Sequence, residues 1–281
     1  MKPIQTLRKT RKVFRTAPPT AWFGMTVILI VLIAGLFAPI VAPYGETEIV
    51  GAPGLTIGGH FLFGTDQIGR DILSRVIFGA RNTVGIAFIT TILAFSLGLV
   101  TGLLAAVLGR WADQLLSRIV DILMAIPSLI FALLILTMTG TSIVNMVLVI
   151  AVLESTRVYR LTRAVGMNVG VLDFVEVAKL RGEGLWWIIR HEMLPNIATP
   201  LAAEFGLRFC FVFLFISALS FLGLGIQPPT ADWGSMVREN ATLISFGLPT
   251  PLVPAAAIAL LTVSVNFVVD WFLYQTSGLK D

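Results

Sequence analysis

Three long runs without a charged residue constrain this chain more than any other feature. They cover residues 22–41, 84–108 and 122–140. Each run is close to or above the roughly 20 apolar residues that a helix needs to cross the hydrocarbon core of a bilayer. Charged residues make up only 13% of the 281-residue sequence, whereas a typical soluble domain has about 25%. Because a backbone in lipid must satisfy its own hydrogen bonds, the sequence predicts an all-α integral membrane protein.

Three further runs are apolar but less regular. Residues 142–153 end at Glu154, residues 197–222 contain Glu204 and Arg208, and residues 251–272 stay uncharged until Asp270. A run as short as the first could also be a re-entrant segment. We predict six transmembrane helices, at about residues 22–41, 84–108, 119–140, 142–160, 197–222 and 251–273. They form one transmembrane domain (residues 22–281) after an N-terminal tail (1–21), with outer loops at 42–83 and 223–250 and an inner loop at 161–196.

Basic residues are distributed unevenly between the two sides of these predicted helices. Only Arg70, Arg75, Arg81 and Arg238 fall on the side of the outer loops. Apart from Arg208 within a helix, the other Lys and Arg residues lie on the side of the termini, which favours the cytoplasm for that side. We therefore expect both termini in the cytoplasm and a first helix that is retained, not cleaved as a signal peptide. The net charge of +4 then reflects orientation and requires no nucleic-acid partner.

Small residues recur at every fourth position of the second predicted helix. They are Ala94, Gly98, Gly102 and Ala106. Such a stripe lets another helix approach closely, although the ordinary composition of membrane helices can also produce one. We predict a helix-packing face here.

A shorter helix is predicted just before this one. The apolar residues between positions 68 and 77 recur at helical spacing, and Thr65 or Asp66 can cap a helix at its start. This helix is either an interfacial helix that leads into the second span or a short solvated helix.

Charged residues interrupt the apolar chain at residues 172–196, LDFVEVAKLRGEGLWWIIRHEMLPN. Asp173 is a suitable N-cap and Glu176 can complete a capping box, so a helix is predicted to begin here. Gly182 and Gly184 permit the left-handed turn that ends it. Residues 185–193 predict a second helix, which stops before Pro195.

Two functions are compatible with this helix, bend and second helix. One is a connector whose Trp186 and Trp187 rest at the lipid headgroups. Most connections are much shorter than this one, however. We therefore interpret the segment as a docking surface for another cytoplasmic protein.

The same segment resembles a known motif. Glu176, Ala178, Gly182, Leu194 and Pro195 fall at the spacing of the EAA loop of ABC importer permeases. The pattern is incomplete, because Val177 and Glu192 stand where the family usually has Ala and often has Ile. In that family the loop couples the permease to its ATPase, which would also involve the neighbouring Asp173 and Gly184.

Two stretches on the outer side resemble the peptide, opine and nickel branch of these importers, and specifically its C-type permease. They read FGTDQIGRDILSRVIFGAR (residues 63–81) and LSFLGLGIQPPTADWGSMV (residues 219–237). The motif residues are Gly64, Asp66, Gly69, Arg70, Asp71, Arg75, Gly79, Arg81, Pro228, Pro229, Asp232 and Trp233. Family members often have a glutamate shortly before LSFLGLG, whereas this chain has Ile216, so a pore role for that glutamate cannot be carried over.

The resemblance implies a type I importer permease fold in a bacterial inner membrane and a function in alternating access. It also implies four kinds of partner: a second homologous permease, two ATP-binding subunits, an extracytoplasmic solute-binding protein and membrane lipid. ATP and Mg would be held by the ATP-binding subunits, and this chain would bind no cofactor. The expected cargo is di- or oligopeptides, with nickel chelates, opines and glutathione as alternatives.

Enzyme chemistry has little support in the sequence. His191 and Glu192 begin an HE pair, but Pro195 stands where the second histidine of a zinc site would be. The chain contains no GxxxxGK[ST] phosphate-binding loop. We therefore expect no catalytic residues and no metal site, with ATP hydrolysis on partner subunits.

An ion-coupled secondary transporter is the competing hypothesis, because ionisable residues inside spans often mark ion pathways. The candidates are Glu154, Glu204, Arg208 and Asp270. Glu204 and Arg208 are four residues apart and can pair on one helix face. We expect Glu154 and Asp270 to reach water near the cytoplasmic ends of their helices, so structural roles are favoured.

Overall fold

The computed structural model describes residues 17–276, and within them the fold is entirely helical, with three isolated β-bridges. Most of the predicted tail, residues 1–16, lies outside the described part. The elements are α2 (Pro19–Leu36), α3 (Ala38–Val41), α4 (Ile72–Gly79), η1 (Ala80–Val84), α5 (Gly85–Val107), α6 (Arg110–Ala125), α7 (Ser128–Thr139), α8 (Ile143–Gly170), α9 (Asp173–Leu180), α10 (Leu185–Ile188), η2 (Ile189–Met193), α11 (Leu194–Phe221), α12 (Trp233–Asn240), η3 (Ala241–Phe246) and α13 (Leu252–Thr276).

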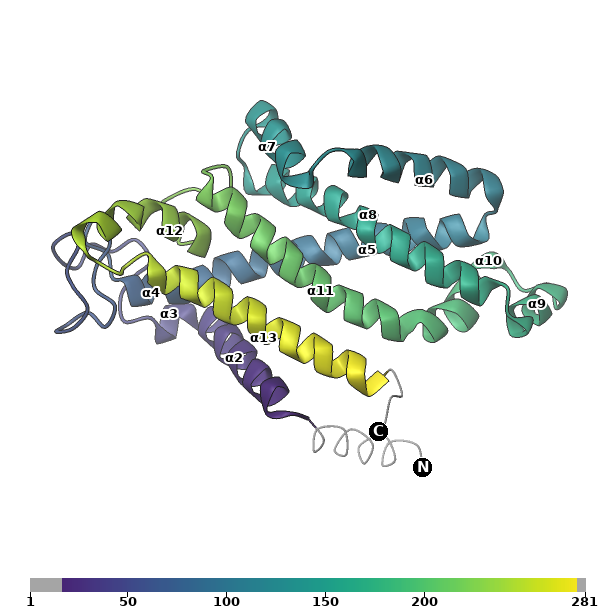
Figure 1. Ribbon diagram of the computed structural model, residues 1–281, viewed down its shortest axis with the longest axis horizontal. Coiled ribbons are helices and arrows are strands. Elements are labelled where there is room, and N and C mark those ends of the chain that lie inside the picture. Colours follow the sequence, from purple (N-terminus) through teal and green to yellow (C-terminus); the bar gives the residue numbers. More distant parts are fainter. Residues whose placement is uncertain (1–16, 277–281) are drawn as a thin grey trace.

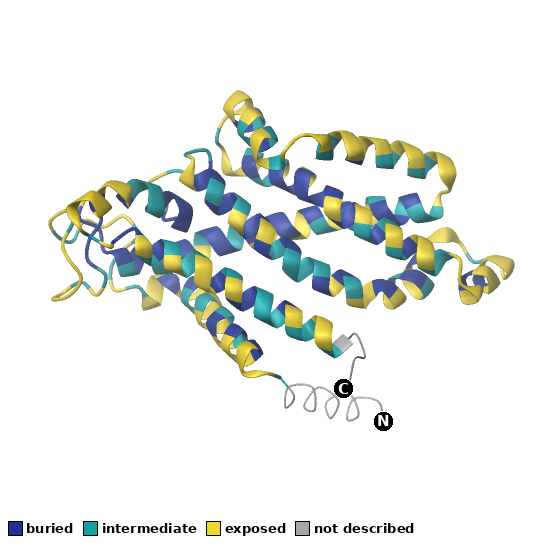
Figure 2. Cartoon of the chain, in the orientation of Figure 1, coloured by how far each residue is buried: buried dark blue, intermediate teal, exposed yellow. Residues whose placement is uncertain are grey.

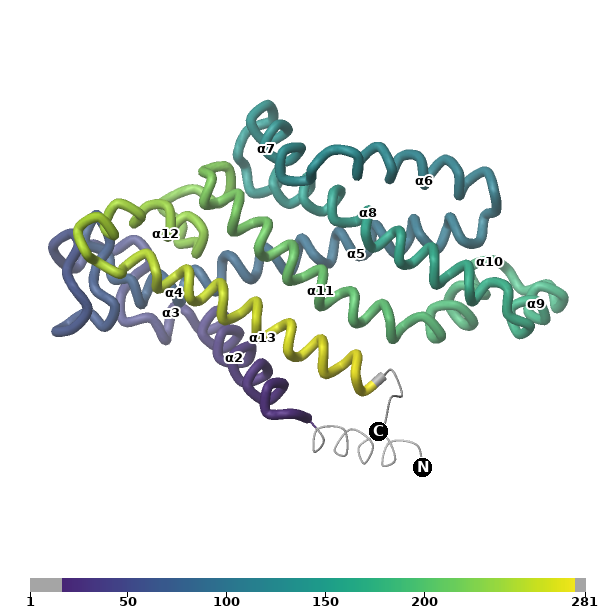
Figure 3. Tube along the Cα trace, viewed as in Figure 1, coloured from purple at the N-terminus to yellow at the C-terminus, as the bar shows by residue number. Residues whose placement is uncertain are grey.

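The long helices run roughly along one axis of an elongated molecule (Figure 1). One end carries α9 and α10, and we call it the α9 end. The other end carries α3, α4, α12 and the loops between them, and we call it the α12 end. The tube view follows the chain between these two ends (Figure 3).

Close helix packing in the bundle depends on small residues. Gly24 of α2 faces Ser264 of α13 so closely that a Cβ would come within 2.4 Å of its carbonyl oxygen. Buried residues follow the inner faces of the helices, while exposed residues cover the outside (Figure 2). Many of the exposed residues are large and apolar, such as Ile30 and Leu36 of α2. A surface of this kind suits lipid rather than water.

Four helices are long and apolar enough to cross a membrane: Pro19–Leu36, Ile72–Val107, Leu185–Phe221 and Leu252–Gln275. A fifth crossing is formed if the bent pair α6 and α7 counts as one span. The predicted fourth span falls in α8, which is 28 residues long but carries Glu154, Arg157 and Arg160 in its first two thirds. These charges lower its hydropathy, so its length alone supports a crossing.

The third predicted span is not one continuous helix. α6 and α7 meet at an angle of 86°. The break falls at Ile126, which is extended (φ −98°, ψ 134°) and directly precedes Pro127. A proline disfavours the helical conformation of the residue before it, which explains the position of the break.

The short helix before the second span also differs from the prediction. α4 begins at Ile72, and its cap is Asp71, whose carboxylate accepts a hydrogen bond from the Ser74 N–H. Thr65 and Asp66 do not cap it, because both are engaged in other contacts. α4 continues through the π-helical turn η1 into α5, as predicted for a helix that leads into the second span, and none of its residues is exposed, so it is not a separate solvated helix.

Candidate functional site

Residues 172–193, which the sequence predicts to couple the permease to its ATPase and which we call the coupling segment, form the α9 end. α9 begins one residue earlier than predicted: Leu172 and not Asp173 is its N-cap, and Asp173 is its first helical residue. No side chain caps the helix, so the predicted capping box is wrong. Asp173 and Glu176 both lie in the first turn, where negative charge is favourable for the helix dipole.

α9 ends in a Schellman turn around Gly182. The N–H of Glu183 donates to the Ala178 carbonyl, and the N–H of Gly182 donates to the Lys179 carbonyl. Gly182 has φ +79°, a conformation that a side chain would strain. The predicted left-handed glycine is therefore confirmed at Gly182. It is wrong at Gly184, which is extended (φ −70°, ψ 155°) and precedes α10.

The second helix of the segment does not stop before Pro195. α10 continues through the π-helical turn η2 into α11, with the Leu194 N–H donating to the Ile189 carbonyl five residues earlier. Pro195 lies near the start of α11, where its missing N–H costs little. The wider turn thus lets one helix pass through a residue that the sequence predicts as a stop.

One side of the coupling segment is fixed to the bundle and the other is free. Val175, Ala178 and Ile188 are buried in a cluster that also includes Leu103 of α5. Leu180, in contrast, is 82% exposed, and Trp186 is 70% exposed. Trp187 is partly buried and stacks on His191, so the two tryptophans do not share one environment.

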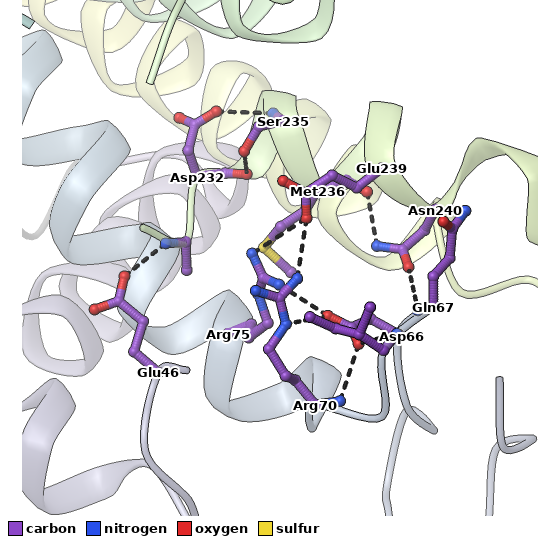
Figure 4. A network of polar contacts seen from close by, with 12 residues as sticks. Glu46, Asp66, Gln67, Arg70, Arg75, Asp232, Ser235, Met236, Glu239 and Asn240 are labelled. Carbon is purple, nitrogen blue, oxygen red and sulfur yellow. Dashed lines mark hydrogen bonds and ion pairs between the residues drawn. The ribbon is translucent and has the colours of Figure 1, made fainter. Parts of the chain in front are cut away.

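At the α12 end, the two outer motif stretches meet in a buried ion network (Figure 4). The Asp66 carboxylate accepts from Arg70 Nε at 2.5 Å and from Arg75 Nη1 at 2.8 Å. Glu239 Oε2 lies 3.1 Å from Arg70 Nη2 and 3.4 Å from Arg75 Nη2. Burial raises the pKa of the Glu239 carboxyl, and Arg70 partly opposes this effect. The network ties the loop before α4 to α12.

Asp232 and Trp233 form the second half of this contact. Asp232 accepts from the Thr83 hydroxyl and from the Ser235 N–H, both at 2.8 Å, and burial raises the pKa of its carboxyl. Trp233 Nε1 donates to the Val76 carbonyl at 2.9 Å. A Cβ on Gly79 would come within 2.5 Å of the Trp233 ring, so the glycine lets α4 approach α12.

The remaining motif residues shape the loops around this network. Gly64 and Gly69 have positive φ, and a Cβ on either would collide with a backbone carbonyl oxygen. Arg81 is exposed. The Pro228–Pro229 bond is cis. A pocket opens between the loop before α4 and α12, and it is lined by Asp66, Gln67, Ile68, Arg70, Pro228, Pro229, Glu239 and Asn240.

The small-residue stripe of α5 packs against α8. A Cβ on Gly98 would lie 2.5 Å from the Ser155 carbonyl oxygen, and one on Gly102 would lie 2.8 Å from Thr162 Cβ. Ala94 is fully buried, and Ala106 faces Gly166. The stripe is therefore a helix-packing face.

The ionisable residues of the bundle interior form a triad. Arg208 Nε donates to Glu204 at 2.9 Å, which confirms the predicted pairing, and Arg208 Nη1 donates to Glu154 at 2.5 Å. Glu154 is buried, so the expectation that it reaches water is wrong. Sequence reasoning missed the contact because Glu154 lies on a different helix. Asp270 is exposed.

A bundle of apolar helices with bilayer length, joined at one end by a helix, a glycine turn and a second helix, is the architecture of a multi-pass membrane protein. Residues 98–276 match the model of the family described as binding-protein-dependent transport system inner membrane component, and the chain belongs to this family. It is thus a multi-pass inner membrane protein and a permease subunit of an importer.

Three similar proteins are permeases of transport systems for peptides or glutathione. The chain is 35% identical to the di/tripeptide transport system permease protein DppC of Pseudomonas aeruginosa, over 92% of this chain and 85% of that protein. It is 34% identical to the dipeptide transport system permease protein DppC of Haemophilus influenzae, over 93% and 88%. It is 30% identical to the glutathione transport system permease protein GsiD of Pectobacterium atrosepticum, over 92% and 84%.

Proposed function

We propose that this chain forms half of the translocation pathway of an ATP-driven importer for di- or oligopeptides. The observation that carries this proposal is its similarity, over more than nine tenths of its length, to permeases named for di- and tripeptides. Glutathione is the alternative that the comparisons favour, because a glutathione permease matches at 30% identity.

In this proposal the chain crosses the membrane six times. The crossings are α2 with α3, α4 with α5, the bent pair α6 and α7, then α8, α11 and α13. The α9 end would face the cytoplasm and the α12 end the outside, because the N-terminal tail and the inner loop are rich in basic residues. Both termini would then be cytoplasmic.

The coupling segment would dock on a cytoplasmic ATPase. Its buried side joins it to α5, and its exposed side offers Leu180 and Trp186 to a partner. Exposed leucine and tryptophan between charged residues suit a protein interface. ATP and Mg would bind to the two ATPase subunits, while a second permease completes the pathway and a solute-binding protein delivers the cargo at the α12 end.

Alternating access would then be driven through this contact. ATP closes the ATPase pair, and the docked coupling segment moves with the ATPase. α11 moves with the segment because the two are continuous. A ligand shifts such an equilibrium only by its differential contacts with the two states, and the docked ATPase would supply this difference.

Gly182→Asp tests the coupling role. We expect the variant to insert into the membrane normally, because no span is changed, but to lose peptide uptake or copurification of the ATPase. Gly109→Asp is the matched control, since Gly109 also has positive φ and open space around it and lies in the turn between α5 and α6. Wild-type uptake and ATPase recovery in Gly182→Asp would reduce the segment to a connector.

Uptake by reconstituted complexes tests the wider function. We expect the complete complex to import dipeptides only with ATP, and the isolated chain to do neither transport nor ATP hydrolysis. Ion-driven uptake by the isolated chain would instead identify a secondary transporter. Import of glutathione with no import of dipeptides would identify glutathione as the cargo.

A further inference from the structure

Three arginines follow one another at every third position of α8, and two of them form ion pairs with α6. Arg160 lies 2.9 Å from Asp121 of α6, and Arg163 pairs with Asp113 of the same helix. Arg157 is exposed, and no carboxylate of residues 17–276 lies within ion-pair distance of it. Of the three arginines, only Arg157 is therefore without a direct ion pair among these residues.

Arg157 contacts an aromatic ring next to the buried triad. Its guanidinium lies 5.6 Å from the centroid of Phe211 on α11, and the Arg208 guanidinium lies 4.9 Å from the same centroid. Both distances suit cation–π contacts. Arg208 is buried and forms ion pairs with both Glu154 and Glu204. Because Phe211 is about half exposed, the charge accessible at this surface is that of Arg157.

The contact with Phe211 holds Arg157 at the depth of the predicted spans. Arg157 lies within the predicted fourth span, residues 142–160, and Phe211 lies near the middle of the predicted fifth span, residues 197–222.

The direction of this surface is set by the packing of α8. Ser155 and Gly166 face α5, and at about 100° per residue they lie on the opposite side of α8 from Arg157. Arg157 therefore lies on the face of α8 that is turned away from α5. Ionisable side chains at membrane depth face a bundle interior or a water-filled cavity and not lipid.

We propose that Arg157 and Phe211 line the translocation pathway, and that Arg157 binds a carboxylate of the cargo in transit. This proposal rests on the proposed peptide import. Every peptide with a free C-terminus carries a carboxylate, and a guanidinium can bind it through two parallel hydrogen bonds. The Phe211 ring would contact cargo side chains without selecting one sequence, because its attraction for apolar groups is not directional.

Cysteine labelling tests whether this surface is in water. Replacing the single cysteine (Cys210→Ala) gives a background for Arg157→Cys and Phe211→Cys, with Ile30→Cys on the exposed apolar face of α2 as the lipid-facing control. In the assembled complex we expect a charged methanethiosulfonate to modify both positions at least about tenfold faster than Ile30→Cys in one nucleotide state, since thiolate chemistry requires water. Rates equal to that of Ile30→Cys in every state would overturn the proposal.

Transport by charge variants tests the carboxylate contact. We expect Arg157→Gln to lower dipeptide uptake by about tenfold, the scale of one hydrogen bond to a charged group, with complex recovery and ATP hydrolysis unchanged. Arg157→Lys should retain most uptake, and Arg160→Gln, on the same helix, is the control. Wild-type uptake by Arg157→Gln would overturn the carboxylate role, and loss of assembly by this variant would leave the decision to the labelling rates. If the wild-type complex imports no peptide, the proposed function fails, while the labelling result still decides whether the surface lines a pathway.

Discussion

At the scale of single residues, the charge triad of α8 and α11 is stable only as a unit. Arg208 satisfies Glu154 and Glu204 together, and all three side chains are at most 14% exposed. Removing one member of a buried ion pair leaves the other charged and desolvated, which costs about 3–5 kcal/mol. We expect Arg208→Met to destabilise the protein by about that amount, measured as the free energy of unfolding in detergent.

A triple variant separates this effect from lost packing. Glu154→Gln, Glu204→Gln and Arg208→Met together remove every charge of the triad. We expect the combination to be more stable than Arg208→Met alone, because no carboxylate remains buried without a partner. Equal or greater destabilisation would show that the arginine acts mainly through its contacts with Phe211 and its neighbours.

Glu239 should make stability depend on pH. Burial raises its pKa above the ordinary value of 4.5, so the folded state holds this proton more tightly than the unfolded state. Its stabilising contribution is then complete below pH 4.5 and is lost as the pH rises through the raised value. We expect the melting temperature of Glu239→Gln to fall less than that of wild type between pH 4.5 and neutral pH. A change of the same size in the exposed control Glu48→Gln would contradict this assignment.

The residue scale also shows where sequence reasoning reaches its limit. The Glu204–Arg208 pair follows from a spacing of four along one helix. The Glu154–Arg208 pair joins residues 54 positions apart, and it depends on how α8 and α11 cross. No local pattern contains that information, which is why the prediction that Glu154 reaches water is wrong.

At the scale of elements, the glycines of α5 set its distance from α8. A Cβ on Gly98 would meet the Ser155 carbonyl oxygen at 2.5 Å, and backbone cannot move as a side chain can. We expect Gly98→Ala to destabilise the protein by about 1–3 kcal/mol through overpacking. Gly85→Ala in the same helix has open space and should be neutral or stabilising by up to about 1 kcal/mol. Thermal unfolding of both variants in detergent checks the pair, and equal melting temperatures would contradict a packing role.

The sequence predicts where helices lie better than it predicts where they break or join. The apolar runs located α2, α5, α7, α11 and α13, because hydrophobicity decides which segments enter lipid. They did not give the full length of α6 or α8, which carry charged residues. The break between α6 and α7 follows from Pro127, a signal that the sequence contains. The π-helical turns η1 and η2 do not follow from any single residue, because they adjust helix register to tertiary packing. They explain why two predicted helix ends are instead continuous helices.

At the scale of the whole molecule, two long helices join the ends. The apolar helix Ile72–Val107 and the helix Leu185–Phe221 have 36 and 37 residues, which is about 54–56 Å at 1.5 Å per residue. The first carries the motif stretch that contacts α12, and the second begins in the coupling segment. Phe213 of α11 also packs edge-to-face on Trp233 of α12. A displacement of the coupling segment would therefore reach the α12 end through helix and not through loops.

A rigid helix makes a measurable prediction about this path. In the Cys210→Ala background, spin labels at Leu185→Cys and Phe221→Cys would mark the two ends of the helix Leu185–Phe221, because both positions are exposed. We expect their separation to change by less than about 3 Å between nucleotide-free and ATP-bound complexes, since packed helices move as bodies and hinges lie at loops or element ends. Pro200 within α11 is the weakest point, because it lacks the N–H that would bond to the preceding turn. A larger change in the spin-label distance would place a hinge at Pro200 or at η2, and the coupling segment would then move without carrying the α12 end along.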